Sequence, residues 1–317
     1  MARSSIQPVR DSAMTFSGLA ARYIQHLGAY KGYSPRTCDC YGLTYAQFRG
    51  YLQMQGATDD VRHFDAEHCE GFAKALSAGG MKPNSVNVKL AGLSSLAAYA
   101  MKVKLPTGKY VLDENPMTRF DRPQKQRVSR KFLYRDELDR LRALPCAPNE
   151  SLLRDLFIDT GLRASELTRA NVEDLWMDAK ERVIVSVSVK GRGRAEEKVP
   201  VSLGADVAAR LVESIRHREA SGKDPLVVNQ AGARYTRSAA YEVIGRLARR
   251  AGIDRFKVGS HTLRHAFNTL GLAAGLSVPV QAALLNHSDT GTVQKYQHLQ
   301  PDELFDARER VREVLRG

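Results

Sequence analysis

The sequence contains no run of 18 apolar residues, and its first 14 residues are polar. The first absence excludes a transmembrane helix, and the second excludes a secretory signal segment with an apolar centre. We therefore expect a cytoplasmic protein that is neither exported nor associated with a membrane.

Cysteine is also scarce, with Cys38, Cys40, Cys69 and Cys146 as its only four examples. Four thiols do not form a disulfide framework in a chain of 317 residues. Cys38 and Cys40 lie two apart in a helical pattern and so point in different directions. Together with His68 and Cys69 they suggest zinc only weakly, and structural thiols in a reducing compartment are the better interpretation.

Motifs that bind metals or nucleotides are missing as well. There is no HExxH, no CxxC and no pair of carboxylates at ligand spacing. Gly191 and Gly193 lie in a predicted hairpin and lack the GK[ST] ending of a phosphate-binding loop. We therefore expect no metal, no ATP and no other cofactor.

What the chain has in excess is positive charge. Its formal net charge is +13 over 317 residues, and its pI is about 9.7. A chain of this length favours two domains, each with a core of its own. A strongly basic surface favours a polyanionic partner, and DNA or RNA is the first candidate.

The first third of the chain predicts helices only. Apolar residues recur at helical spacing from Phe16, and Ser34-Pro35 is a strong helix start. Further helical segments cover about 66–77 and 84–102, and no strand alternation precedes residue 105. We expect a flexible N-terminus over 1–12 and a domain of four or five helices over 13–105.

A basic segment with Pro106, Pro116 and Pro123 follows, and it is typical of an extended linker over 106–131. In the remainder, 132–317, the alternating residues Val183–Val189 and Lys198–Val201 predict a hairpin between helices. Helices are expected at about 134, 151–160, 204–220 and 238–251. The predicted fold class is mainly α with a small antiparallel β-sheet.

Two motifs in this second domain carry polar groups suited to a phosphate. The first is Thr160-Gly161-Leu162-Arg163-Ala164-Ser165-Glu166-Leu167, in which Glu166 lies three residues from Arg163 and can brace its guanidinium. The second is Ser260-His261-Thr262-Leu263-Arg264-His265-Ala266-Phe267, in which His261 and Arg264 share one helix face. Further on come His287 and, nine residues later, Tyr296.

The ordered set Arg163, Lys190, His261, Arg264, His287 and Tyr296 resembles that of the tyrosine recombinases, which include the phage integrases and the Xer recombinases. The resemblance is strongest from about Phe132 to Leu299. It implies an N-terminal helical core-binding (SAM-like) domain that contacts DNA, with the catalytic tyrosine recombinase domain over 132–317. It also implies a site-specific recombinase that cleaves and rejoins DNA through a 3′-phosphotyrosine intermediate, without metal or ATP.

The resemblance assigns a role to each member of the set. Tyr296 is the nucleophile, and Arg163, Arg264 and His287 stabilise the charge on the non-bridging phosphate oxygens. His261 accepts or shares the phenol proton, and Lys190 protonates the departing 5′ oxygen.

Two departures from the family pattern bear on these roles. Asn286 stands where many relatives have glycine before the second histidine. The hairpin loop after Lys190 is about two residues longer than usual, so Lys198, Arg192 and Arg194 stay open as alternative proton donors.

Partners follow from the same resemblance: double-stranded DNA with an inverted-repeat site, two protomers per site and four in a synapse, near the nucleoid. Arg237, at the start of a helix, is a candidate for reading a guanine. Arg246, Arg249 and Arg250 are expected to meet phosphates or solvent. The amphipathic tail over 300–317 is expected to dock on a neighbouring subunit, with packing on its own domain as the alternative.

Two other functions remain open. A type IB topoisomerase uses a similar set of residues but relaxes one duplex as a monomer. A non-catalytic DNA-binding protein would not need the six residues together. The short segment before the helical domain favours a two-domain recombinase of the Xer or Cre type, or one from a mobile element.

Overall fold

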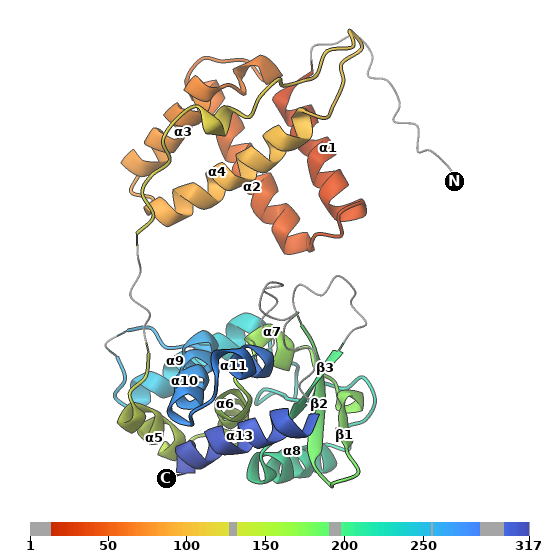
Figure 1. Cartoon of the computed structure of the whole chain (residues 1–317), viewed down its shortest axis with the longest axis vertical. Coiled ribbons are helices and arrows are strands. Elements are labelled where there is room, and N and C mark those ends of the chain that lie inside the picture. The colour runs from red at the N-terminus through yellow and green to blue at the C-terminus, as the bar shows by residue number, and fades with distance from the viewer. Residues whose placement is uncertain (1–13, 127–131, 190–197, 255, 286–300, 317) are drawn as a thin grey trace. The chain divides into compact units, whose positions relative to one another are not determined.

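The computed structural model describes residues 14–126, 132–189, 198–254, 256–285 and 301–316 (Figure 1). The chain divides into two compact units, residues 1–129 and 130–317. The described residues are mostly helical, with one small antiparallel sheet, and the predicted fold class is confirmed. Among them, no helix has the length and apolar character needed to cross a bilayer.

The first unit is a helical bundle. Polar residues start its helices: Thr15 accepts from the backbone N–H of Gly18 at 3.0 Å, and Asp65 accepts from that of His68 at 2.9 Å. Ser34 caps the helix that lies between these two in the sequence, and Pro35 is the first residue of that helix, as predicted. The helices and short 3₁₀ turns are α1 (Phe16–Ala29), α2 (Pro35–Met54), η1 (Val61–His63), α3 (Ala66–Ala78), α4 (Pro83–Ala100) and η2 (Pro116–Thr118).

Aromatic rings fill the centre of this bundle. Phe48 is fully buried and packs against Phe16, Phe64 and Phe72 with ring centroids 5.0–5.7 Å apart. Aromatic rings from α1, α2 and α3 and from the residue after η1 thus meet in the centre of the bundle. Tilted and edge-on pairs of aromatic rings stabilise a core by more than the apolar area that they bury.

The proline-containing segment that follows α4 is partly packed on the first unit. Met117 is buried in the helical core, and the Asn87 side chain of α4 donates to the carbonyl of Pro123 at 2.7 Å. Asn115 likewise donates to the Ser94 hydroxyl at 2.8 Å. Within the segment predicted as a linker, the part up to Pro123 therefore has side-chain anchors on α4.

The second unit combines a cluster of helices with a three-stranded sheet at its edge (Figure 1). Its helices are α5 (Arg135–Ala143), α6 (Pro148–Thr160), α7 (Ala164–Leu167), α8 (Ala205–His217), α9 (Arg237–Arg250), α10 (Ser260–Ala273), α11 (Val278–Leu284) and α13 (Pro301–Arg316), with a 3₁₀ turn η3 (Val172–Asp174). Its strands, in antiparallel order, are β1 (Leu175–Met177), β2 (Val183–Ser188) and β3 (Lys198–Ser202).

The predicted hairpin is the β2–β3 pair, with Ser188 opposite Lys198 and Val185 opposite Val201. Val185 and Val201 are buried, which explains why alternating β-branched residues were a usable signal here. Strand β1 was not predicted, because three residues are too few to show alternation.

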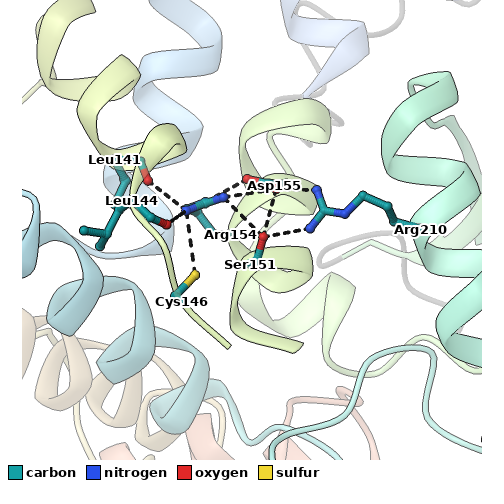
Figure 2. A network of polar contacts seen from close by, with 7 residues as sticks. All are labelled: Leu141, Leu144, Cys146, Ser151, Arg154, Asp155 and Arg210. Carbon is teal, nitrogen blue, oxygen red and sulfur yellow. Dashed lines mark hydrogen bonds and ion pairs between the residues drawn. The ribbon is translucent and has the colours of Figure 1, made fainter. Parts of the chain in front are cut away.

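A buried arginine ties α5, α6 and α8 together (Figure 2). Arg154 of α6 donates to the carbonyls of Leu141 and Leu144, both at 2.9 Å, and to Asp155 at 2.7 Å. Arg210 of α8 reaches the same Asp155 carboxylate at 2.6 Å. The charge of Arg154 is buried, and these bonds repay its desolvation while fixing where α5 ends.

The C-terminal helix α13 packs on its own domain, which is the alternative that the sequence left open beside docking on a neighbouring subunit. Ala307, Val311 and Leu315 are buried in the same core as α6 and α10. The helix is amphipathic, as predicted. Its apolar stripe is buried against the large apolar surface of the same chain, and this burial needs no second protomer.

Both ends of α13 are anchored by polar contacts. At its start, Asp302 pairs with Lys180 at 2.7 Å and with Arg182 at 2.9 Å, both near the β1–β2 turn. At its end, the carbonyl of Leu315 accepts from Arg142 at 2.8 Å and from Arg135 at 3.0 Å. These arginines satisfy carbonyls that a helix leaves free in its last turn.

Candidate active site

The two sequence motifs meet where α6 ends. Gly161 follows α6 in the left-handed region, with φ of 65°. A Cβ at this glycine would lie 2.9 Å from the ring of Phe267, the last residue of the second motif. Glycine is needed here for its backbone conformation and for the close approach of the ring. This contact brings the 160–167 turn against α10.

Arg163 begins α7, and Glu166 holds it in place. The Glu166 carboxylate accepts from the backbone N–H of Arg163 at 2.8 Å and from its Nη1 at 2.6 Å. The predicted brace is therefore present. Glu166 is 2% exposed, whereas Arg163 is half-buried, so the guanidinium is fixed on one side and open to solvent on the other.

Arg264 projects from the first turns of α10 into the same place. It is 7% exposed, and its Nη1 donates to the carbonyl of Gly161 at 2.8 Å while Nη2 donates to the carbonyl of Leu285. Its Nη1 also lies 3.9 Å from the Glu166 carboxylate. Burial, together with the neighbouring Arg163, lowers the pKa of Arg264 to about 10, so it stays protonated at neutral pH.

His261 lies one turn before Arg264, with its side chain exposed. Burial of part of the ring, followed by the charges of Arg264 and Arg163, lowers the pKa of His261 from its ordinary value of 6.5. Arg237, at the first position of α9, contributes to the same shift. The imidazole is thus neutral at pH 7 and able to accept a proton.

These groups together make a site for an anion. Two guanidiniums, Arg163 and Arg264, share one buried carboxylate, so the described residues at this point keep an excess of positive charge. Planar guanidiniums match phosphate oxygens in geometry and charge. A neutral imidazole beside them is the group that general-base chemistry needs.

Of the six predicted catalytic residues, the described part of the chain brings Arg163, His261 and Arg264 together. Lys190, His287 and Tyr296 lie outside the described residues, as do Asn286 and the rival donors Arg192 and Arg194. The remaining rival, Lys198, begins β3 and is paired with Asp174.

Two of the arginines expected to meet phosphates or solvent have partners inside the domain. Arg246 pairs with the buried Glu150 at 2.5 Å, and Arg250 donates to the carbonyl of Pro145 at 2.9 Å. Arg249 and Arg237 are exposed. The helix that Arg237 was expected to begin is α9, and Thr236 caps it by accepting from the N–H of Ala239 at 3.0 Å.

The described residues contain one group with metal-ligand chemistry, formed by His63, Asp65 and His68 in the first unit, with ligand atoms within 4.8 Å of one another. The Asp65 carboxylate already caps α3 and accepts from the ring and the backbone of His68 at 2.9 Å. Helix capping accounts for this arrangement. Cys69 is buried beside it, and burial raises the pKa of its thiol.

Sequence reasoning missed a second layer of buried arginines on α13. Arg308 donates to the carbonyl of Thr160 at 3.0 Å, and Arg312 pairs with Asp159 at 2.6 Å and 3.0 Å. The signal was available, because Arg308 and Arg312 fall on the apolar face of the predicted tail between Ala307, Val311 and Leu315. A charge on the buried face of a helix needs a partner in the core.

Comparison with known protein families decides the assignment. The model of the phage integrase family matches residues 131–303, and that of the phage integrase N-terminal SAM-like domain matches residues 20–104. The chain belongs to the phage integrase family. The family predicted from the six-residue set is therefore confirmed.

Relatives of this integrase-family chain include tyrosine recombinases of the Xer type. The XerD recombinase of Corynebacterium glutamicum is 28% identical over 309 residues, covering 94% of this chain and 97% of the relative. The XerD recombinase of Caulobacter vibrioides is 29% identical over 296 residues, covering 90% and 93%. The predicted enzyme class, a tyrosine-type site-specific recombinase, agrees with these relatives.

Solved structures share the fold. XerH recombinase bound to a palindromic difH substrate has a TM-score of 0.73 at 18% identity, covering 95% of this chain and 98% of that chain. A lambda integrase dimer bound to a core site has a TM-score of 0.66 at 17% identity, covering 91% and 100%.

Proposed function

We propose that this member of the family is a site-specific DNA recombinase that cleaves and rejoins strands through a 3′-phosphotyrosine intermediate on Tyr296. The observation that carries the proposal is the meeting of Arg163 and Arg264 over Glu166. Two motifs about a hundred residues apart deliver two guanidiniums to one carboxylate and leave net positive charge facing solvent. A scissile phosphate is the anion that fits this arrangement.

In the proposed reaction the Tyr296 hydroxyl attacks the phosphorus, and its proton passes to the neutral His261. The bond from phosphorus to the 5′ oxygen breaks, and Lys190 protonates that oxygen. Arg163, Arg264 and His287 hold the non-bridging oxygens as charge develops on them. The phosphotyrosine ester keeps the energy of the broken bond, so a 5′ hydroxyl can reverse the step without ATP.

The proposed substrate is double-stranded DNA with an inverted-repeat site, held by two protomers, with four protomers in a synapse. Support comes from the net charge of +13 and from the solved relatives, which are bound to a palindromic site and, for lambda integrase, form a tetramer on a Holliday junction. The N-terminal unit, with its match to the integrase SAM-like domain, is proposed to contact the DNA around the core site.

A nicked suicide substrate tests the proposal. Cleavage should leave the protein covalently attached to DNA on a denaturing gel, and Tyr296→Phe should abolish the band while DNA binding is retained. A band that persists in Tyr296→Phe would exclude this nucleophile. Tyr241 would be the next to test, since its ring lies against Gly259 at the start of α10.

A further inference from the structure

The C-terminal helix reaches the turn that carries the first motif through a single side chain. Arg308, in the middle of α13, donates from Nη1 to the carbonyl of Thr160 at 3.0 Å and from Nη2 to that of Leu284 at 2.7 Å. One guanidinium thus bridges the last residue of α6 and the last residue of α11.

Arg264 makes the same bridge one residue further along each segment. Its two terminal nitrogens donate to the carbonyls of Gly161 and Leu285, the next residues after those that Arg308 holds. Two guanidiniums therefore link the same pair of chain segments at consecutive carbonyls. A shift of either segment relative to the other would disturb both bridges.

The guanidinium of Arg308 is charged and buried, and its desolvation costs free energy. The side chain is 4% exposed and lies 5.7 Å from the ring centroid of Phe267. Burial, followed by the charge of Arg312, lowers the pKa of Arg308 to about 9, so it is still protonated at neutral pH. A buried guanidinium whose hydrogen bonds go to carbonyls gives little net stability, but it fixes the geometry of the groups that it joins.

We propose that Arg308 is a positioning residue for the active site, which holds the end of α6 and the end of α11 in the register that Arg264 needs to face the scissile phosphate. The inference rests on the proposed function for the role of Arg264 toward phosphate. The hydrogen bonds of Arg308 go to backbone carbonyls. Since Asn286 and His287 follow Leu285 directly in the sequence, the same bridge fixes the point from which that pair of residues departs.

Arg312 provides the matched comparison. It lies one turn further along α13, is 3% exposed, and pairs with Asp159 and the carbonyl of Ser202. Arg312→Met and Arg308→Met both remove a buried guanidinium from the same helix, but only Arg308→Met removes the bridge beside Arg264. Arg310 is exposed on the same helix, so Arg310→Met controls for loss of positive charge alone.

The first measurement does not depend on DNA chemistry. NMR spectra of the arginine side chains, with the Arg264 signals assigned by their loss in Arg264→Ala, report how that guanidinium is held. Arg308→Met should move the Arg264 signals toward those of a mobile arginine, whereas Arg312→Met and Arg310→Met should leave them in place. Unmoved Arg264 signals in a folded Arg308→Met protein would overturn the proposal.

The second measurement is single-turnover cleavage of the suicide substrate at saturating protein, well below the melting temperature of each variant. Misplacement of a catalytic group by about 1 Å can cost on the order of 100-fold in rate, and a loss of this size is expected for Arg308→Met. In an Arg264→Ala background the same change should have little further effect, because its target is gone. Losses that multiply would show that Arg308 acts on something other than Arg264.

Failure of the two proposals is distinguishable. A wild-type protein that forms no covalent adduct would refute the proposed recombinase reaction, and the NMR comparison would still decide whether Arg308 positions Arg264. If Arg308→Met does not fold, Arg308→Lys keeps the charge but has one terminal nitrogen and cannot span both carbonyls as a rigid fork. It should still displace the Arg264 signals, and signals left in place in that variant would again refute the bridge.

Discussion

Lys198 forms an ion pair with the carboxylate of Asp174, which is 5% exposed. A lysine that donates its proton to a leaving group would leave this buried carboxylate without its counter-charge. Such a loss is costly in the protein interior. Lys198 is therefore occupied in holding the base of the β2–β3 hairpin against η3, and Lys190 is the better candidate for the general acid.

Lys190→Ala should cleave ordinary DNA about 10²–10⁴-fold more slowly than the wild-type protein, as expected for loss of a general acid. A 5′-bridging sulfur leaves as a thiolate without a proton, so the variant should approach the wild-type rate on a 5′-phosphorothiolate substrate. Arg163→Ala and Arg264→Ala should stay slow on both substrates, because the sulfur does not change the non-bridging oxygens.

Lys198→Ala is the control for this experiment. It should lower the melting temperature and show no selective rescue by sulfur. If sulfur rescues Lys198→Ala and not Lys190→Ala, Lys198 is the general acid. If it rescues neither variant, the same substrate tests Arg192→Ala and Arg194→Ala.

His261 should give the protein a defined response to pH. Because its pKa in the folded state is lowered below 6.5, the unfolded chain binds a proton more readily as pH falls through that value. The histidine therefore adds nothing to stability at pH 8 and destabilises the fold at acidic pH. His261→Gln should match wild type in melting temperature at pH 8 and exceed it at pH 5. If the difference in melting temperature between His261→Gln and wild type is the same at pH 5 and pH 8, the lowered pKa does not belong to His261.

Gly161→Ala should disrupt the meeting of the two motifs. The new Cβ would need to occupy space 2.9 Å from the Phe267 ring, in a backbone conformation with positive φ. Strained backbone of this kind and overpacking each cost about 1–3 kcal/mol. Gly252→Ala has a similar φ of 71° but nothing within 4 Å of its Cβ, so it isolates the backbone cost. Denaturant unfolding should show the larger loss at Gly161, together with slower cleavage.

The buried ion pair between Arg312 of α13 and Asp159 of α6 should stabilise the second unit. Removing one partner of a buried pair costs about 3–5 kcal/mol, so Arg312→Met should destabilise the domain by that order, as measured by chemical denaturation. Arg310→Met, on the exposed side of the same helix, should not. Deleting residues 300–317 should unfold the second unit and abolish DNA cleavage altogether. A folded and active truncated protein would show that α13 is dispensable.

Readout of DNA sequence is expected at the start of α9. Arg237→Ala should relax preference at one base position, since a bidentate contact to guanine is worth about 1–3 kcal/mol of discrimination. Arg249→Ala should weaken binding to all sequences alike and reduce the salt dependence. Selection from a randomised site compares the two. Unchanged preference in Arg237→Ala would place the readout elsewhere, and its nearness to His261 would then suggest a role beside the scissile phosphate.

Much of the fold followed from local signals. Ser34-Pro35 and the alternation of Val183–Val189 each depend on neighbours a few residues away, and the helix and the hairpin formed where these signals stand. Arg163 and Glu166 were also within one turn of each other. Patterns of this range are visible in a single sequence.

The rest depended on contacts between distant parts of the chain. The tail was assigned to a neighbouring subunit because an amphipathic stripe does not specify which surface covers it. The Arg308 contact with Thr160 spans 148 residues. The local pattern places Arg308 on the apolar face of its helix but does not identify the carbonyl that it meets. Likewise, the segment that contains Met117 and Pro123 has the proline content of a linker. It nevertheless packs on the first unit, because Met117 is buried in the helical core and Asn87 donates to the carbonyl of Pro123.

The pairing of Asp159 with Arg312 has a consequence for how the protein is made. The two residues are 153 positions apart, and a ribosome adding about 5–20 residues per second needs on the order of 10 s to synthesise that interval. During this time the nascent chain has α6 and its acidic residue but not the arginine that neutralises it. The bonds that Arg308 and Arg312 make to the end of α6 therefore form only after α13 has been synthesised.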